Sequence, residues 1–198
     1  MKTKTTNAEI YQLKITLIGS ANPPIWRRVL APAEMSLAKL HHAIQLVFGW
    51  HDCHLHEFSS GHDRYGPPDL DDDYGGLPAP ASESKTKLPA VLGWVKATLR
   101  YTYDFGDGWE HAIVTEKILA PDAALAYPTC IDGKGRCPLE DCGGLGGFYE
   151  LLKVLGNPKH PEYAGMLEWA GGPIDRNDFS VVEADNRLQS MRKKRQRG

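Results

Sequence analysis

Two alternating segments on either side of a GDGW turn constrain the fold of this chain most. Apolar and polar residues alternate along WVKATLRYTYDF, residues 94–105, and again along HAIVTEKIL, residues 111–119. A period of two is typical of a half-buried strand, because successive side chains point to opposite faces of a sheet. Glycine and aspartate between two such segments favour a tight turn. The sequence therefore predicts an antiparallel hairpin here.

Further strands are predicted before this hairpin. Residues 11–17, YQLKITL, alternate in the same way, and residues 25–30, IWRRVL, follow after two prolines, so these segments are expected to pair as antiparallel strands. A shorter strand is predicted over residues 54–60, HLHEFSS, with His54 and His56 on one side. Together the segments indicate a sheet that is rich in antiparallel pairs.

Helical patterns lie between and after these strands. Ser36 suits the N-cap of a helix over residues 37–48, and Gly49 is expected to end it. Later helices are predicted over residues 148–155, over residues 161–169 and from Ser180 onward. Strands first and helices later predict an α+β fold, in which an antiparallel-rich sheet is covered by helices.

The chain is expected to form a single domain, residues 1–198, that contains one long loop insertion. Its length suits one large domain with a sizeable core. Residues 61–90 are rich in Gly, Pro, Asp and Ser without periodicity, which predicts a flexible insertion. Residues 187–198 form a basic tail at the end of the last helix, where cations complement the helix dipole.

Composition and charge limit the partners of the chain. The net charge is −2, so no overall basic field favours a nucleic acid, and a protein partner is the stronger expectation. The N-terminus lacks the apolar stretch of a signal peptide, and no run of about 18 apolar residues suggests a membrane span. We therefore expect a cytoplasmic protein.

Three cysteines lie close together in YPTCIDGKGRCPLEDCGG, residues 127–144. Cys130, Cys137 and Cys142 are separated by turn residues, and a cysteine cluster in the cytosol points to a metal more than to a disulfide. One tetrahedral zinc ion would need a fourth ligand, for which His111 is the first candidate and His54 or His56 the alternative. Asp141 or water could also complete the site. The same thiols could instead pack as small hydrophobic groups or act in redox chemistry.

Carboxylates in two other stretches are candidates for catalysis. Asp104 and Asp107 lie in YDFGDGWEH, and Glu140 lies within the cysteine-rich stretch. Beside a bound metal, any of them could act as a general base in hydrolysis, although Asp and Gly are also what a turn requires. CGGLGGF matches neither common nucleotide-binding glycine motif, so no nucleotide cofactor is expected.

These motifs, in this order, resemble the plasmid pRiA4b ORF-3-like family, whose members are often labelled transposon passenger or TnpR-like proteins. The resemblance rests on W-x-R at Trp26, on HLHEF, on Y-x-YDFGD-x-W-x-H and on YP-x-C…CP-x-ED-CGG, and it extends from about Tyr11 to about Leu188. It implies a compact α+β domain associated with mobile elements and no established activity. The motif positions that carry over are Tyr103, Asp104, Phe105, Gly106, Asp107, Trp109, His111, Cys130, Cys137, Pro138, Glu140, Asp141, Cys142, Gly143 and Gly144.

Three functions follow as hypotheses. The first is a cytoplasmic binding or accessory module whose cysteine-based site holds a structural, zinc-like metal. The second is a metal-dependent hydrolase that uses the YDFGDGWEH carboxylates, and the third is a metal-free protein-interaction domain. Site-specific recombination is disfavoured, because the chain is slightly acidic and has no arginine cluster beside a candidate nucleophile.

Overall fold

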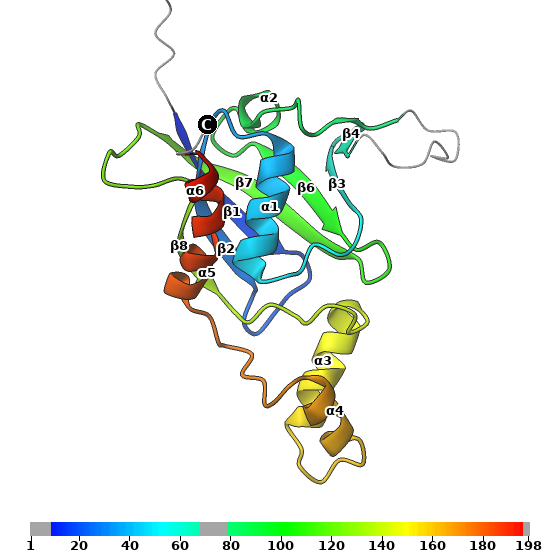
Figure 1. Ribbon diagram of the computed structural model, residues 1–198. Coiled ribbons are helices and arrows are strands. Elements are labelled where there is room, and N and C mark those ends of the chain that lie inside the picture. Colours follow the sequence, from blue (N-terminus) through cyan, green and yellow to red (C-terminus); the bar gives the residue numbers. More distant parts are fainter. Residues whose placement is uncertain (1–8, 68–78, 196–198) are drawn as a thin grey trace, which may run out of the picture.

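An eight-stranded sheet forms the centre of the computed structural model, which describes residues 9–67 and 79–195 (Figure 1). The strand order is β5-β4-β3-β6-β7-β1-β2-β8, and all neighbours pair antiparallel except β4 and β5. The strands are β1 (Ile10–Leu17), β2 (Trp26–Pro32), β3 (His56–Ser60), β4 (Asp63–Gly66), β5 (Ala81–Ser82), β6 (Thr98–Tyr103), β7 (Trp109–Leu119) and β8 (Thr129–Lys134).

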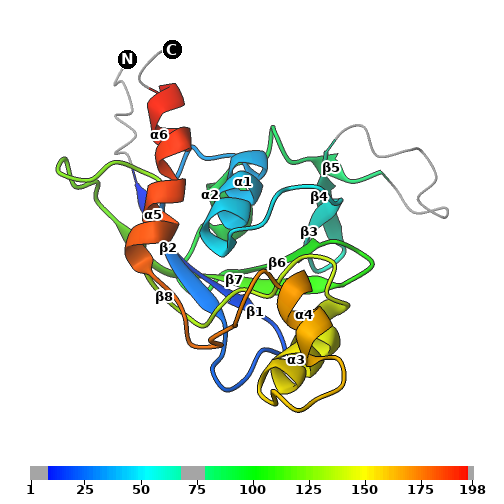
Figure 2. The same ribbon diagram turned by 60° about the horizontal axis from the view of Figure 1, so that its bottom comes forward.

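Helices cover this sheet, which confirms the predicted α+β class. They are α1 (Leu37–Phe48), α2 (Leu88–Leu92), α3 (Gly144–Leu155), α4 (Tyr163–Trp169), α5 (Val181–Arg187) and α6 (Gln189–Arg195). In both views α1 lies across the sheet with α5 beside it, whereas α3 and α4 form a pair near one end (Figures 1 and 2). None of the helices within the described residues combines the length and the apolar character that a membrane crossing needs.

The predicted hairpin is present as β6 and β7, in a register that pairs Tyr103 with Trp109 and Leu99 with Ile113. Alternate side chains of both strands are fully or nearly fully buried against α1, while their neighbours are partly exposed. The apolar stripe of α1 closes this layer, because Leu40 and Ile44 are completely buried. Hydrophobic burial on one face of the sheet therefore explains the alternation in the sequence.

Four local predictions need correction. The strand predicted from His54 begins at His56, because the chain bends at His54 and joins the ladder with β6 only from His56 onward. Cys130 lies on strand β8 and not in a loop, the helix predicted from Pro161 begins at Tyr163, and the last helix is divided into α5 and α6. The insertion 61–90 contains β4, β5 and the start of α2. Its flexibility stays a prediction, and its residues 68–78 lie outside the described part of the chain.

Candidate functional site

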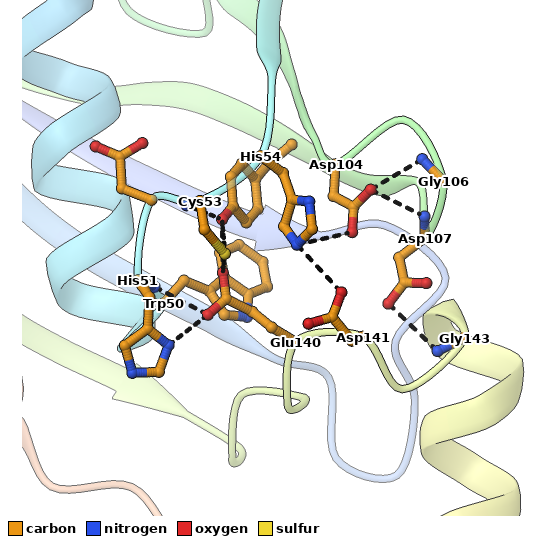
Figure 3. A network of polar contacts seen from close by, with 12 residues as sticks. Trp50, His51, Cys53, His54, Asp104, Gly106, Asp107, Glu140, Asp141 and Gly143 are labelled. Atoms are coloured by element: carbon orange, nitrogen blue, oxygen red, sulfur yellow. Dashed lines mark hydrogen bonds and ion pairs between the residues drawn. The ribbon is translucent and has the colours of Figure 1, made fainter.

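Three loops meet at the end of β6 and carry a network of polar side chains (Figure 3). The first follows α1 and supplies His51, Cys53 and His54. The second is the turn between β6 and β7, which supplies Asp104, and the third precedes α3 and supplies residues 140–141. The site therefore combines segments that are far apart in the sequence, and the hairpin end brings them together.

His54 is the centre of one group of potential metal ligands. Its Nε2 atom lies 3.2 Å from Oδ1 of Asp141 and 3.6 Å from Oδ2 of Asp104 (Figure 3). The Nε2 atom is buried from solvent, yet it has no hydrogen bond of acceptable geometry among the described residues. A buried nitrogen that lies within ion-pair distance of two carboxylate oxygens, without a well-formed hydrogen bond to either, is in a position suited to sharing a cation with them.

The backbone holds both carboxylates in place. Asp104 has a φ of 55° and Asp141 a φ of 59°, a left-handed conformation that costs free energy for residues other than glycine. The Oδ1 atom of Asp104 accepts hydrogen bonds from the amides of Gly106, at 2.9 Å, and Asp107, at 3.3 Å. Because these bonds use Oδ1, the other oxygen of Asp104 is left to face His54.

Glu140 connects the loop before α3 to the other two segments. Its carboxylate accepts hydrogen bonds from the hydroxyl of Tyr103 at 2.5 Å, from the backbone amide of His51 at 3.0 Å and from the thiol of Cys53 at 3.5 Å. Burial acts to raise the pKa of Glu140, but these bonds outweigh it and hold that pKa below its usual value. Burial first, and then the bond to Glu140, raises the pKa of Tyr103. Glu140 is therefore a preformed carboxylate and Tyr103 a proton donor to it.

Asp107 links the turn between β6 and β7 to the loop that precedes α3. Its Oδ2 atom accepts a hydrogen bond from the amide of Gly143 at 3.3 Å, which joins the β6–β7 turn to the residue that precedes α3 (Figure 3). This bond holds Asp141, two residues earlier in the chain, near the turn. The catalytic role suggested for Asp107 stays a prediction, and the arrangement gives it a positioning role.

Within the described residues, three groups of side chains place potential metal-ligand atoms within 4.8 Å of one another. Two of them share His54: the first adds Asp104 and Asp141, and the second adds Cys53 and Glu140. The third group lies between α1 and the loop after it, and it consists of His41, His42 and Asp52. The site in Figure 3 is thus the one in which two candidate groups overlap.

The predicted cysteine site is not among these groups, which contain neither Cys130, Cys137, Cys142 nor His111. Cys130 is 3% exposed on β8, and Cys142 contacts the carbonyl of Gly144 through its sulfur at 3.7 Å. Burial raises the pKa of Cys130 to about 11 and that of Cys142 to about 12, and it raises that of Cys137 further. The arrangement favours the alternative of packed, protonated thiols, and zinc binding by this set stays a prediction.

Two further candidate ligands, His111 and His56, are engaged in packing and pairing contacts within the fold. The ring of His111 is completely buried, with the rings of Phe48 and Trp50 packed edge to face against it at 4.8 and 5.3 Å. His56 pairs with Glu83 at 2.8 Å and stacks on His41 with 3.4 Å between ring centroids. Of the candidates from the sequence, the structure therefore brings His54, Asp104 and Glu140 together.

His111 makes the stability of the fold depend on pH. Burial lowers its pKa from 6.5 to about 3, although nearby backbone groups of Trp109 and Tyr101 oppose this shift in part. The unfolded chain binds a proton at His111 between these two values and the folded chain does not, so stability falls as the pH falls below 6.5. Between pH 7.5 and 5.0 we expect a loss of about 2 kcal/mol in the free energy of unfolding from this residue.

Urea denaturation at both pH values measures this loss. The variant His111→Phe keeps an aromatic ring and should lose the stability decrease that belongs to His111. The matched change His62→Phe affects an exposed residue and should retain it. An unchanged pH dependence in His111→Phe would show that other groups cause it.

Sequence reasoning left Cys53 and His51 out of the site. Cys53 lies apart from the other cysteines in WHDCHLHEF, and its position beside Glu140 depends on the loop between α1 and β3. The available signal was the crowding of histidines in that segment. Asp141 was considered only as a possible partner of the cysteines, whereas the structure places it beside His54.

The fold and this site characterise a class of α+β proteins in which loops at one end of an antiparallel sheet gather histidine, cysteine and carboxylates. The model of the family described as plasmid pRiA4b ORF-3-like protein matches residues 9–183, so the chain belongs to this family. The resemblance stated from the motifs is thereby confirmed.

Two relatives have comparable length. The chain is 37% identical over 164 residues to the uncharacterized protein y4hQ of Sinorhizobium fredii (strain NBRC 101917 / NGR234), which covers 83% of this chain and 82% of that protein. It is also similar to the crystal structure of MM3350, a protein of unknown function from Methanosarcina mazei Go1. That comparison has a TM-score of 0.78 at 36% identity and covers 90% of this chain and 97% of the other.

Proposed function

We propose that this protein is a metal-binding accessory module that holds one divalent transition-metal ion through His54, Asp104 and Asp141. The observation that carries the proposal is the buried Nε2 atom of His54, which faces both carboxylates without a hydrogen bond to either. Cys53 and Glu140, grouped with the same histidine, are further potential ligands. One imidazole with carboxylates suits zinc, manganese or iron rather than a soft thiolate-bound metal.

The state of the cysteines supports an intracellular role for such a module. All four cysteines lie within the described residues and are free thiols, as expected in a reducing compartment. We therefore propose that the module acts in the cytoplasm. The family resemblance implies an association with mobile elements. In this proposal a mobile element carries the gene, and the protein performs a metal-dependent function of its own.

Titration calorimetry of EDTA-treated protein with Zn²⁺ and with Mn²⁺ tests the metal site. We expect about one ion per chain and a loss of at least about 100-fold in affinity for His54→Ala, since an imidazole ligand is removed. The exposed control His62→Ala should bind like the unchanged protein.

The variant Cys137→Ser separates this site from the one predicted at the cysteines. Our proposal requires that Cys137→Ser retains full affinity. If affinity is lost in Cys137→Ser and kept in His54→Ala, the metal belongs to the cysteine set instead. If the unchanged protein binds neither ion, the metal-free interaction domain becomes the better hypothesis.

A second candidate is a hydrolase at the same site. The side chain of Asp141 is 71% exposed, so solvent reaches the ligand group, and an ion held by three protein ligands keeps positions for water. Glu140, ionised at neutral pH, could then act as the general base. The metal-loaded protein can be assayed with p-nitrophenyl phosphate and p-nitrophenyl acetate. Turnover that disappears in Asp104→Asn would support this candidate, and its absence from the unchanged protein would support binding alone.

A further inference from the structure

A cleft lies beside the C-terminal end of α1, between β2 and α5. Its volume is about 250 Å³, and three arginines line it: Arg27, Arg136 and Arg187. Ser180 and Phe179, at the start of α5, contribute to its wall. A concentration of guanidinium groups in a small polar cleft differs from the slightly acidic character of the whole chain.

Arg27 is the most unusual of these residues, because it is only 2% exposed. Its Nε atom donates to the carbonyl of Val47 at 3.0 Å, and its Nη1 atom donates to the carbonyls of Trp26 and Lys134, both at 2.9 Å. Among the described residues, no carboxylate forms an ion pair with Arg27 and no acceptor bonds to its Nη2 atom. The rings of Phe179 and Phe48 lie over the guanidinium, with their centroids 4.1 and 4.9 Å from its central carbon, and offset part of the cost of this buried charge. The charge still has no counter-charge, so an anion would stabilise it further.

Arg187 brings a second positive charge to the same cleft. Its Nε atom donates to the carbonyl of Leu46 at 2.6 Å, and it too forms no ion pair within the described part of the chain. Both guanidinium groups line the cleft. Burial lowers the pKa of Arg27 to about 10, Cys137 and Cys130 oppose this shift, and Arg187 adds a smaller lowering effect. Two like charges are therefore held together although they repel each other.

The end of α1 explains part of this arrangement. The carbonyls of Leu46 and Val47 belong to the last turn of the helix, where the negative end of the helix dipole stabilises cations. These contacts use the Nε atoms, and Nη1 of Arg27 is engaged as well. Among the described residues, Nη2 of Arg27 and both Nη atoms of Arg187 therefore have no acceptor. The contacts with the end of α1 therefore explain the position of the two arginines. They do not supply a negative charge that would cancel the repulsion between the two guanidinium groups.

The acidic residues around the cleft are mostly engaged elsewhere. Asp178 pairs with Arg136 at 3.1 Å, and Glu140 accepts its hydrogen bonds from Tyr103 and His51. Glu183 also lines the cleft and is exposed to solvent. None of these three carboxylates forms an ion pair with Arg27 or Arg187 in the described structure, so the two cations are free to receive an external anion.

We propose that this cleft binds a phosphate group, either as free phosphate or as the end of a phosphomonoester, between Arg27 and Arg187. The two Nη atoms of Arg187 can donate parallel hydrogen bonds to a tetrahedral oxyanion and Nη2 of Arg27 can add another, and such charge-assisted bonds are stronger than neutral ones. The bound anion would neutralise the buried charge of Arg27 and remove the repulsion between the two arginines. The volume of the cleft leaves space for an organic substituent beside the phosphate.

This proposal does not depend on the metal site, although the two sites are neighbours. His51 and Glu140 line the arginine cleft and also belong to the network around Cys53 and His54. A phosphomonoester held by the arginines would thus lie beside the proposed metal ion. The variant His54→Ala should lose the metal and retain phosphate binding, so failure of one proposal is distinguishable from failure of the other.

Titration calorimetry and thermal denaturation of the EDTA-treated full chain with sodium phosphate test the proposal, at an ionic strength held constant with chloride. We expect one phosphate per chain and a higher melting temperature. The variant Arg187→Gln should weaken binding about tenfold or more, which corresponds to the loss of one charge-assisted hydrogen bond. The control Arg100→Gln removes an exposed arginine that pairs with Glu110 on β7, and it should bind phosphate normally.

The remaining outcomes decide the matter and name the ligand. Glycerol 3-phosphate that binds more tightly than phosphate would indicate an organic phosphomonoester, and equal affinity would indicate the free anion. Absence of binding heat and of a shift in melting temperature at about 10 mM phosphate, with the ionic strength held constant, would overturn the proposal. Equal weakening in Arg187→Gln and Arg100→Gln would also overturn it, because the effect would then be non-specific.

Discussion

Replacing Trp109 by alanine is expected to lower the free energy of unfolding by about 4 kcal/mol, the scale found for large buried aromatic residues. Trp109 is the largest completely buried side chain, at the first position of β7. Its ring packs against Trp50 with 5.8 Å between centroids, and alanine would leave a cavity there. Trp94→Ala is the matched control: that side chain is 65% exposed, so its removal should change stability by less than about 0.5 kcal/mol.

Urea denaturation followed by far-UV circular dichroism measures both variants, because tryptophan fluorescence would change with the substitution itself. Trp50 links this core to the site: its indole nitrogen donates to the carbonyl of Pro138 at 3.1 Å, two residues before Glu140. We therefore expect the folded fraction of Trp109→Ala to bind metal more weakly as well. Equal losses of stability in Trp109→Ala and Trp94→Ala would show that burial at the hairpin does not control the fold.

The central strands could be predicted from the sequence because one physical cause produces their pattern. In β1, β6 and β7 the side chains that face α1 are buried, and the positions between them are more polar. This alternation is directly visible as a period of two in the sequence. The pairing of β1 with β7, across about a hundred residues, has no such local signal, because it depends on how the whole sheet closes around α1.

The edge strand β8 could not be predicted in the same way. Its residues, TCIDGK, are few, and only the first two are buried. Glycine and aspartate in this segment indicate a turn, yet β8 pairs with β2 from Trp26 to Leu30. The pairing shifts register between Arg28 and Val29, which lets an irregular segment join the sheet. As a result Cys130 is held on an edge strand by β2 and does not lie in a loop.

The site was predicted in part for a related reason. The motifs drew attention to Asp104 and Glu140, because carboxylates beside tight turns are suited to chemistry, and His54 was an alternative ligand. Its partners follow from tertiary structure: residues 50–55 enter the site only because α1 ends at Gly49, whose φ of 87° reverses the chain. Chemical type was therefore predictable from sequence, whereas the convergence of three loops was not.

Two neighbouring glycines at the start of α3 offer the sharpest test of how that convergence is held. A Cβ atom on Gly147 would lie 1.7 Å from the carbonyl oxygen of Cys142, but one on Gly146 would have no atom within 4 Å. We expect Gly147→Ala to lower the free energy of unfolding by about 3 kcal/mol, at the upper end of overpacking costs, since backbone must move. Gly146→Ala should raise it by about 0.5–1 kcal/mol through better helix propensity.

The same pair of variants connects packing to function. Cys142 follows Asp141, so a displaced Cys142 carbonyl should also displace the Asp141 carboxylate from His54. Zn²⁺ affinity, measured on folded protein, should therefore fall for Gly147→Ala and stay unchanged for Gly146→Ala. Full affinity together with lost stability would mean that the ion is held without Asp141, and unchanged stability would mean that the loop does not pack on α3 as described. Because both substitutions add one methyl group to the same helix, any difference between them reports the position of this loop alone.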